Sequence, residues 1–169
     1  KLGKAIRFPV SDLRVFAGRT STGVRGIQLA DADEVMSMSI ITGSTASIED
    51  RDVYLKIAAA ERRLTEENKT PIYADCCKDA AASMDEKLYR ELQLQEQFIL
   101  TISDRGFGKR TSCYEYRQAN RGGLGIAAMA VTDKTGNMVA AYPITEAEQI
   151  MLVSDQGQLI RMPVKGIRI

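Results

Sequence analysis

The chain contains an internal repeat, and this repeat constrains the fold more than any other feature of the sequence. Residues 3–14, 106–117 and 157–168 align without gaps, and each segment opens on a glycine. Equivalent positions lie 103 and then 51 residues apart, so one repeat is about 51 residues and the first interval is nearly doubled. Arginines occupy two aligned positions: the first column is Arg7, Arg110 and Arg161, and the second column is Arg14, Arg117 and Arg168.

The segments that flank the aligned glycines also match. Residues 98–104 align with 149–155, and residues 34–38 align with 137–141. Short runs rich in β-forming residues end in glycine-containing turns, and a further strand is predicted at 127–131. A period near 50 residues with about four strands is typical of propeller blades. We therefore predict an all-β fold, built from propeller-like blades of four-stranded antiparallel sheets.

The extra length of the first interval lies between residues 41 and 97 and is predicted to be helical. Ser47 is a good N-cap, with Glu49 and Asp50 in the first turn, and Val53, Ile57, Ala60 and Leu64 follow at helical spacing. The run 66–71, which ends in proline, is expected to end this helix. The domain limits follow: a fragment of one β domain over 1–169, with a partial blade and the start of the next at 1–41, a helical acidic insertion at 47–96, a blade at 97–148 and a partial blade at 149–169.

A second helix is predicted in the insertion. Ser83 and Glu86 have the spacing of a capping box, in which each side chain caps a backbone amide of the first turn. Leu88 and Leu92 follow at helical spacing. The adjacent cysteines at 76–77, Cys76 and Cys77, are interpreted as two helix residues and not as a metal site.

Charge is unevenly distributed along the chain. The net charge is +1, but residues 48–96 hold 8 basic and 12 acidic residues, whereas the rest holds 15 basic and 10 acidic residues. In 6–8 and 160–162 an arginine alternates with apolar neighbours, so it is expected to point away from the core. A periodic array of cations suits the phosphates of duplex DNA, with little sequence preference and strong salt dependence. The candidate DNA-binding residues are Lys4, Arg7, Arg14, Arg19, Arg25, Lys109, Arg110, Arg117, Arg121, Arg161, Lys165 and Arg168.

Composition argues against catalysis by this chain. There is no histidine, which removes Ser-His-Asp and Cys-His mechanisms and the commonest zinc ligand sets. Neither a Walker loop nor a Rossmann fingerprint is present. The three cysteines form no disulfide or metal pattern, which fits a reducing, cytosolic setting, and no apolar run approaches the roughly 20 residues of a membrane span. We expect no catalytic residue, no metal ligand and no cofactor.

The repeat resembles a known unit. The Gly-Val-Arg-Gly-Ile run at 23–27 and the aligned segments at 3–8, 106–111 and 149–161 resemble the repeat of the C-terminal domain of DNA gyrase A subunits, over residues 1–41 and 97–169. The resemblance implies a β-pinwheel, usually of six blades, whose basic rim binds, bends and wraps duplex DNA. It also implies a fragment of the gyrase A subunit, which works with the gyrase B subunit in an A2B2 holoenzyme and supports ATP-dependent negative supercoiling, in the cytoplasm at the nucleoid. The ATP and Mg²⁺ sites and the DNA-cleaving tyrosine would then lie outside this chain.

One departure from the family pattern leaves alternatives open. The hallmark wrapping motif is Gln-basic-basic-Gly-Gly-basic-Gly, and the nearest segment here, 118–125, keeps Arg121 and the glycines but lacks the other basic residues. The C-terminal domain of a topoisomerase IV A subunit, which lacks the motif, is therefore an alternative. A propeller-type protein-interaction scaffold is another, although an aromatic content of 6% and the absence of tryptophan weaken it.

Overall fold

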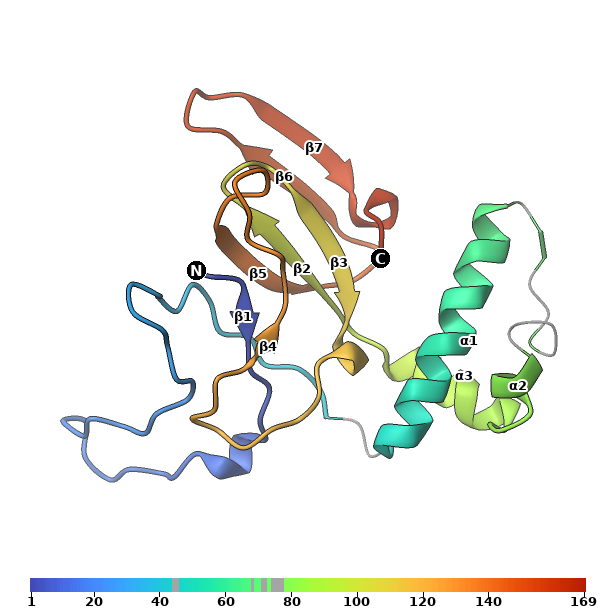
Figure 1. Cartoon of the computed structure of the whole chain (residues 1–169), viewed down its shortest axis with the longest axis horizontal. Coiled ribbons are helices and arrows are strands. Elements are labelled where there is room, and N and C mark those ends of the chain that lie inside the picture. Colours follow the sequence, from blue (N-terminus) through green and yellow to red (C-terminus); the bar gives the residue numbers. More distant parts are fainter. Residues whose placement is uncertain (44–45, 68, 71–72, 74–77) are drawn as a thin grey trace. The chain divides into compact units, whose positions relative to one another are not determined.

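The computed structural model describes residues 1–43, 46–67, 69–70, 73 and 78–169, and Figure 1 shows its elements. The chain divides into two compact units. The first unit, Lys1–Ile41 with Gln97–Ile169, contains all the described strands, and the second unit, Thr42–Glu96, contains the α-helices. Each unit is described by itself below.

Seven short strands and three single-turn 3-10 helices make up the first unit. Its sheets are antiparallel, with orders β3-β2-β5, β1-β4 and β6-β7. The strands are β1 (Lys4–Ala5), β2 (Phe98–Ser103), β3 (Gly108–Ser112), β4 (Ile126–Ala127), β5 (Met138–Ile144), β6 (Gln149–Val153) and β7 (Leu159–Pro163). The 3-10 turns are Val10–Asp12, Cys113–Glu115 and Val164–Gly166, at the 103 and 51 offsets of the sequence repeat.

The hairpin turns repeat in hydrogen bonding as well as in sequence. In the β2–β3 hairpin the Ser103 amide donates to the Phe107 carbonyl at 2.8 Å, and the Gly106 amide donates to the Ser103 carbonyl at 3.0 Å. The β6–β7 hairpin makes the equivalent two bonds, also at 2.8 and 3.0 Å. Gly106 and its counterparts Gly3 and Gly157 have φ angles of 77, 77 and 78°. This left-handed backbone is open to glycine at little cost, which explains the glycine that opens each repeat.

Strand β4 pairs with β1 of the first repeat, so the central sheet has three strands where the sequence suggested four. We predicted a strand over 127–131, but β4 stops at Ala127. The amides of Ala128 and Met129 both donate to the carbonyl of Gly3, at 2.8 and 3.1 Å. Two successive amides bound to one carbonyl break the alternation of a ladder, and the strand ends there.

Residues 34–38 align with β5 but form no strand in the part of the chain that the structure describes. Val35 is 64% exposed and Met38 is 84% exposed. Strand β5 is held by its ladder with β2, and residues 34–38 take part in no such ladder among the described residues. The sequence match therefore did not produce the same structure.

The core of the first unit crosses a repeat boundary. Leu100 of β2, Ile144 of β5 and Val164 of the third repeat are buried together. The Val164 amide donates to the Glu148 carbonyl at 3.0 Å, which fixes the turn against the preceding repeat. Consecutive repeats thus share one core.

The second unit consists of α1 (Ile48–Glu66), α2 (Lys78–Ala81) and α3 (Glu86–Gln95). Ser47 caps α1 as predicted, because its Oγ accepts a bond of 3.0 Å from the Asp50 amide. The predicted capping box at Ser83 is wrong. Its hydroxyl donates to the Ala80 carbonyl at 2.8 Å, and α3 takes Asp85 as its N-cap.

Tyrosines form the interior of the second unit. Tyr54 of α1 and Tyr89 of α3 are fully buried or nearly so, with ring centroids 5.2 Å apart, and the Tyr73 ring lies 5.2 Å from that of Tyr89. The buried face of α1 is Tyr54, Ile57 and Ala58, so the apolar stripe predicted from Val53 was rotated by about one residue. Residues 76–77, the two cysteines, lie outside the described residues.

Candidate nucleic-acid interface

Most of the predicted DNA-binding cations are exposed on the first unit. Arg7 is half-buried and Arg110 is buried. The exposed residues are Lys4, Arg14, Arg19, Arg25, Lys109, Arg117, Arg121, Arg161, Lys165 and Arg168.

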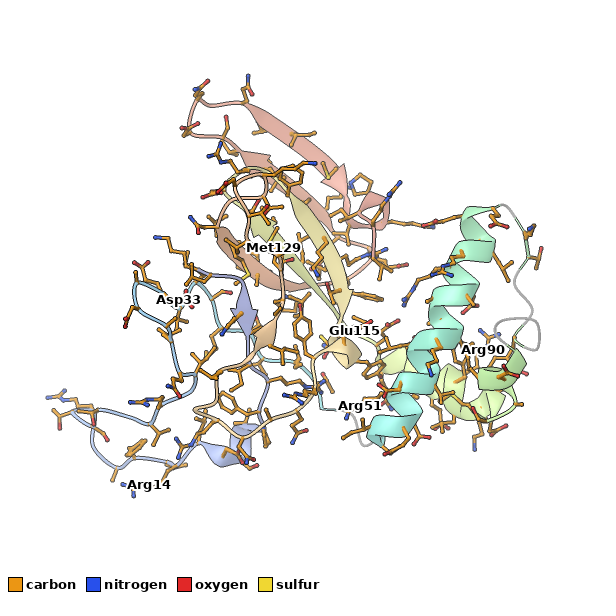
Figure 2. All side chains as sticks on the ribbon, in the orientation of Figure 1. Arg14, Asp33, Arg51, Arg90, Glu115 and Met129 are labelled. Atoms are coloured by element: carbon orange, nitrogen blue, oxygen red, sulfur yellow. The ribbon has the colours of Figure 1, made fainter. Side chains whose placement is uncertain are left out.

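The second column is the most regular part of this set. Arg14, Arg117 and Arg168 each lie two residues after the end of an equivalent 3-10 turn. All three are exposed, and Figure 2 shows the Arg14 side chain pointing outward from the first repeat. The Arg14 guanidinium lies 4.9 Å from the centroid of the Phe16 ring, a cation–π arrangement that leaves its N–H groups available to an anion. A repeated turn thus presents a repeated cation.

The first column is not uniform, and the prediction that it faces solvent is wrong for Arg110. The Arg110 side chain is 6% exposed, its Nη1 donates to Glu146 Oε1 at 3.0 Å, and its guanidinium stacks 5.1 Å from the centroid of the Phe98 ring. Glu146 and Phe98 of β2 together enclose the Arg110 guanidinium. Arg161, by contrast, is exposed and donates from Nε to Gln149 Oε1 at 2.6 Å.

Arg7 is directed at the second repeat. Its Nη1 donates to the carbonyls of Cys113 and Tyr116, at 2.9 and 3.4 Å. These carbonyls lie at the start of the 3-10 turn that precedes Arg117 and directly after it. Burial raises the pKa of the Tyr116 phenol, directly after this turn, above its ordinary value.

The glycine-rich segment 118–125 packs on the first repeat. The Gly122 amide donates to the Gly26 carbonyl at 2.6 Å, with φ 81° at Gly122. The Arg121 guanidinium donates to the carbonyls of Asp12 and Arg25, at 3.2 and 3.1 Å. Arg121 thus stabilises the loop while remaining exposed, and the Gly122 amide is already used within the protein.

Two residues near the predicted site were missed by sequence reasoning. Glu146 and Phe98 enclose Arg110, and neither lies in an arginine column. One signal was available for Glu146. The first repeat has Gly43 at the position of Glu146, 103 residues earlier. The acid therefore accompanies the first-column arginine in the second repeat and not in the first.

The described residues contain no group of three or more His, Cys, Asp or Glu side chains placed to hold a metal ion. Cys113 is a buried thiol outside any disulfide. None of the helices in the described ranges is both long enough and apolar enough to cross a membrane.

Comparison with known proteins supports the interpretation of the repeats. The family described as DNA gyrase C-terminal domain, beta-propeller, matches residues 1–42, 97–145 and 148–169. The matched segments make up most of the chain and leave out the helical unit between them. This confirms the predicted class, an all-β propeller or pinwheel domain.

Relatives match the whole chain, the helical unit included. The DNA gyrase A subunit of Rickettsia conorii is 41% identical over 169 residues, which is 100% of this chain and 18% of the relative. The DNA gyrase A subunit of Granulibacter bethesdensis is 41% identical over 179 residues, again 100% of this chain and 19% of the relative. The corresponding protein of Chlamydia pneumoniae is 28% identical over 169 residues, 99% of this chain and 14% of the relative.

The chain therefore spans less than a fifth of the length of these relatives. The match to the family, the repeated glycine turns and the repeated 3-10 turns agree on the same segments. The chain belongs to the DNA gyrase C-terminal domain family.

Proposed function

We propose that this chain binds duplex DNA without sequence specificity and bends and wraps it, as part of the C-terminal domain of a gyrase A subunit. In this role it supports ATP-dependent negative supercoiling by an A2B2 holoenzyme in the cytoplasm, at the nucleoid. The chain itself supplies no catalytic residue. DNA cleavage, ATP and Mg²⁺ belong to regions of the holoenzyme outside it.

The regular second column is the observation that carries this proposal. Arg14, Arg117 and Arg168 repeat at equivalent positions, and each is exposed after the same kind of turn. Phosphate binding depends on the number and spacing of cations and carries no base information, so a periodic array favours affinity without sequence preference. In a propeller-like domain such an array would be curved, and a curved array favours DNA that can bend.

The distribution of charge supports the same proposal. The residues outside 48–96, which include all the described strands, carry a net charge of +5, and residues 48–96 carry −4. Cations are thus concentrated on the unit that contains the repeats. A protein-interaction scaffold would not need this separation, and its binding would depend weakly on salt.

The test is a salt series with random-sequence duplex DNA. Arg14, Arg117 and Arg168 are changed together to alanine, and the control changes three cations of the helical unit, Lys56, Arg63 and Lys87, so that the net charge falls equally. If each second-column arginine neutralises one phosphate, the slope of log K against log salt becomes shallower by about 2.7 in the first variant and changes little in the control.

The outcomes separate the candidate functions. Equal, small changes in both variants would show that only overall charge matters and would overturn the assignment of the second column. Salt-insensitive binding, or none at low salt, would favour a protein-interaction scaffold. Binding without wrapping of longer DNA would favour the topoisomerase IV type of domain.

A further inference from the structure

We propose that Arg7 and Arg110 of the first column join consecutive repeats and position the second column, and are not phosphate ligands. A phosphate ligand must present its N–H groups to solvent. Arg7 is half-buried with two donated bonds to protein carbonyls, and Arg110 is 5% exposed.

Arg7 links the first repeat to the second through both its backbone and its side chain. Its backbone carbonyl accepts a bond of 2.8 Å from the Ala119 amide. Its side chain donates to the carbonyls of Cys113, the first residue of the 3-10 turn, and of Tyr116, which lies between that turn and Arg117. Hydrogen bonds from a guanidinium to carbonyls are charge-assisted and stronger than neutral ones, so they fix the turn in place.

Arg110 also bonds through its backbone to the next repeat, but here the arginine amide donates, whereas the Arg7 carbonyl accepts. Its amide donates to the carbonyl of Arg168 at 3.0 Å, and Arg168 is the second-column residue of the next repeat. In both cases a first-column arginine is hydrogen-bonded to the segment that follows the 3-10 turn of the next repeat. Two independent crossings at equivalent positions indicate a repeated structural contact.

The side chain of Arg110 uses a different acceptor from that of Arg7. It pairs with Glu146 and stacks on Phe98, both in its own repeat. Its Nε has no hydrogen-bond partner among the described residues. A buried guanidinium needs a counter-charge, and Glu146 provides it. The first repeat has Gly43 at the position of Glu146, so this acid has no counterpart there, and the Arg7 side chain donates to carbonyls.

The contacts of Arg7 and Arg110 position the second-column arginines, which face solvent. Arg7 holds the turn before Arg117, and Arg110 holds the backbone of Arg168. Loss of either contact would free the turn and change the spacing of the second column without removing one of its charges. This consequence for DNA depends on the proposed function, whereas the contact between repeats does not. Arg161 is exposed and stays among the predicted phosphate ligands.

The experiment compares Arg7→Ala and Arg7→Lys with Arg14→Ala. Two quantities are measured: hydrogen exchange at the Tyr116 and Ala119 amides without DNA, and the salt slope of DNA binding. We expect exchange at these amides to rise roughly tenfold or more in both Arg7 variants, because lysine lacks the length and planar fork of arginine. The salt slope stays close to its wild-type value because every second-column charge is kept, and the altered spacing lowers the affinity without changing the slope. Arg14→Ala gives the opposite pattern, with unchanged exchange and a slope shallower by about 0.9.

Arg7→Lys is the decisive variant because it keeps the charge. A phosphate ligand would tolerate lysine, with normal exchange in both Arg7 variants and a shallower slope in Arg7→Ala alone. That pattern would overturn the proposal. Exchange that is unchanged in both variants would also overturn it, whether or not the chain binds DNA.

A second site gives an independent check. Arg110→Met keeps an unbranched apolar side chain in place of the arginine stem while removing the charged guanidinium, so it is less disruptive than alanine. Faster exchange at the Arg110 amide, with an unchanged salt slope, is the expected result. A shallower slope with normal exchange would overturn the proposal. If the wild-type chain binds no DNA, the proposed function fails, and the exchange data still decide whether these arginines join the repeats.

Discussion

The hydroxyl of Tyr54 donates a hydrogen bond of 2.8 Å to Oε2 of Glu96, which joins the middle of α1 to the last residue of the helical unit. Arg62 donates from Nη2 to both oxygens of the same carboxylate, at 3.0 and 2.8 Å. The Glu96 side chain is 5% exposed. One buried carboxylate therefore closes the helical unit at the point where the chain leaves it for β2.

We expect the helical unit to lose stability in alkali. Burial raises the pKa of Tyr54 and of Tyr89 above the ordinary value of 10.0, with Glu96 and Glu61 adding to the effect. The folded unit thus holds these protons more tightly than the unfolded chain does. Their stabilisation is complete below about pH 10 and is lost as the pH rises above it.

Tyr54→Phe tests this dependence, because phenylalanine keeps the ring but has no proton to lose. Urea unfolding followed by far-UV circular dichroism from about pH 8 to 11 should show a smaller alkaline loss in this variant than in the wild type. Tyr142→Phe is the control, since Tyr142 is 56% exposed. An identical alkaline loss in all three proteins would contradict the expectation.

Arg62→Ala should destabilise the helical unit by about 1–3 kcal/mol, because it leaves the buried Glu96 carboxylate without its cation. The free energy of unfolding, measured with urea, gives the value. The control is Arg90→Ala, whose ion pair with Glu86 is 3.7 Å long and exposed on both sides. That change should cost less than about 0.5 kcal/mol. Equal costs would argue against a special role for Glu96.

Gly136→Ala should destabilise the strand-containing unit by about 2 kcal/mol or more. Gly136 has φ 73°, and an added Cβ would lie 1.7 Å from Asp104 Oδ1. That oxygen accepts a bond of 3.0 Å from the Asn137 amide, which ties the β2–β3 hairpin to the start of β5. Gly166→Ala, in the same unit, where a Cβ meets no atom within 4 Å, is the control. Thermal unfolding of both variants measures the difference.

Replacement of residues 47–96 by a short Gly-Ser linker should tighten DNA binding. Residues 48–96 of this segment hold 8 basic and 12 acidic residues in a chain whose net charge is +1, so its removal leaves a more positive protein. The gain should be greatest at low salt and should shrink as salt is added. Titration of labelled duplex at two salt concentrations tests this, and unchanged affinity at low salt would show that the insertion does not tune binding.

Local rules predicted local features of the fold well. Ser47 needs only the first turn of its own helix to act as a cap, and Gly106 needs only its own hairpin. The prediction of the turn at Gly106 was also supported by repetition, because the same turn recurs at Gly157. The failure at Ser83 shows the limit, since α2 provides a competing carbonyl that no capping rule includes.

Features set by partners distant in sequence were not predictable in the same way. Arg110 lies between the polar residues Lys109 and Thr111, so its neighbours do not predict which face of the strand it takes, and Glu146 and Phe98 cover it. The pairing of β4 with β1, and not with a strand of its own repeat, likewise depends on tertiary packing, because the strands are chemically similar. The cations of the second column were predictable as exposed residues, because each follows a short turn at the surface.

The pairing of β1 with β4 has a consequence for the order of folding. Lys4 and Ala127 form one pair of this ladder, and Thr42–Glu96 lies between them. The entropic cost of closing a loop grows with the logarithm of the number of flexible residues. A helical unit that folds first takes close to half of the intervening residues out of the flexible loop, which lowers that cost by about 0.5 kcal/mol. Variants that unfold the helical unit are then expected to slow the refolding of the strand-containing unit about twofold, a kinetic coupling that acts through chain connectivity alone.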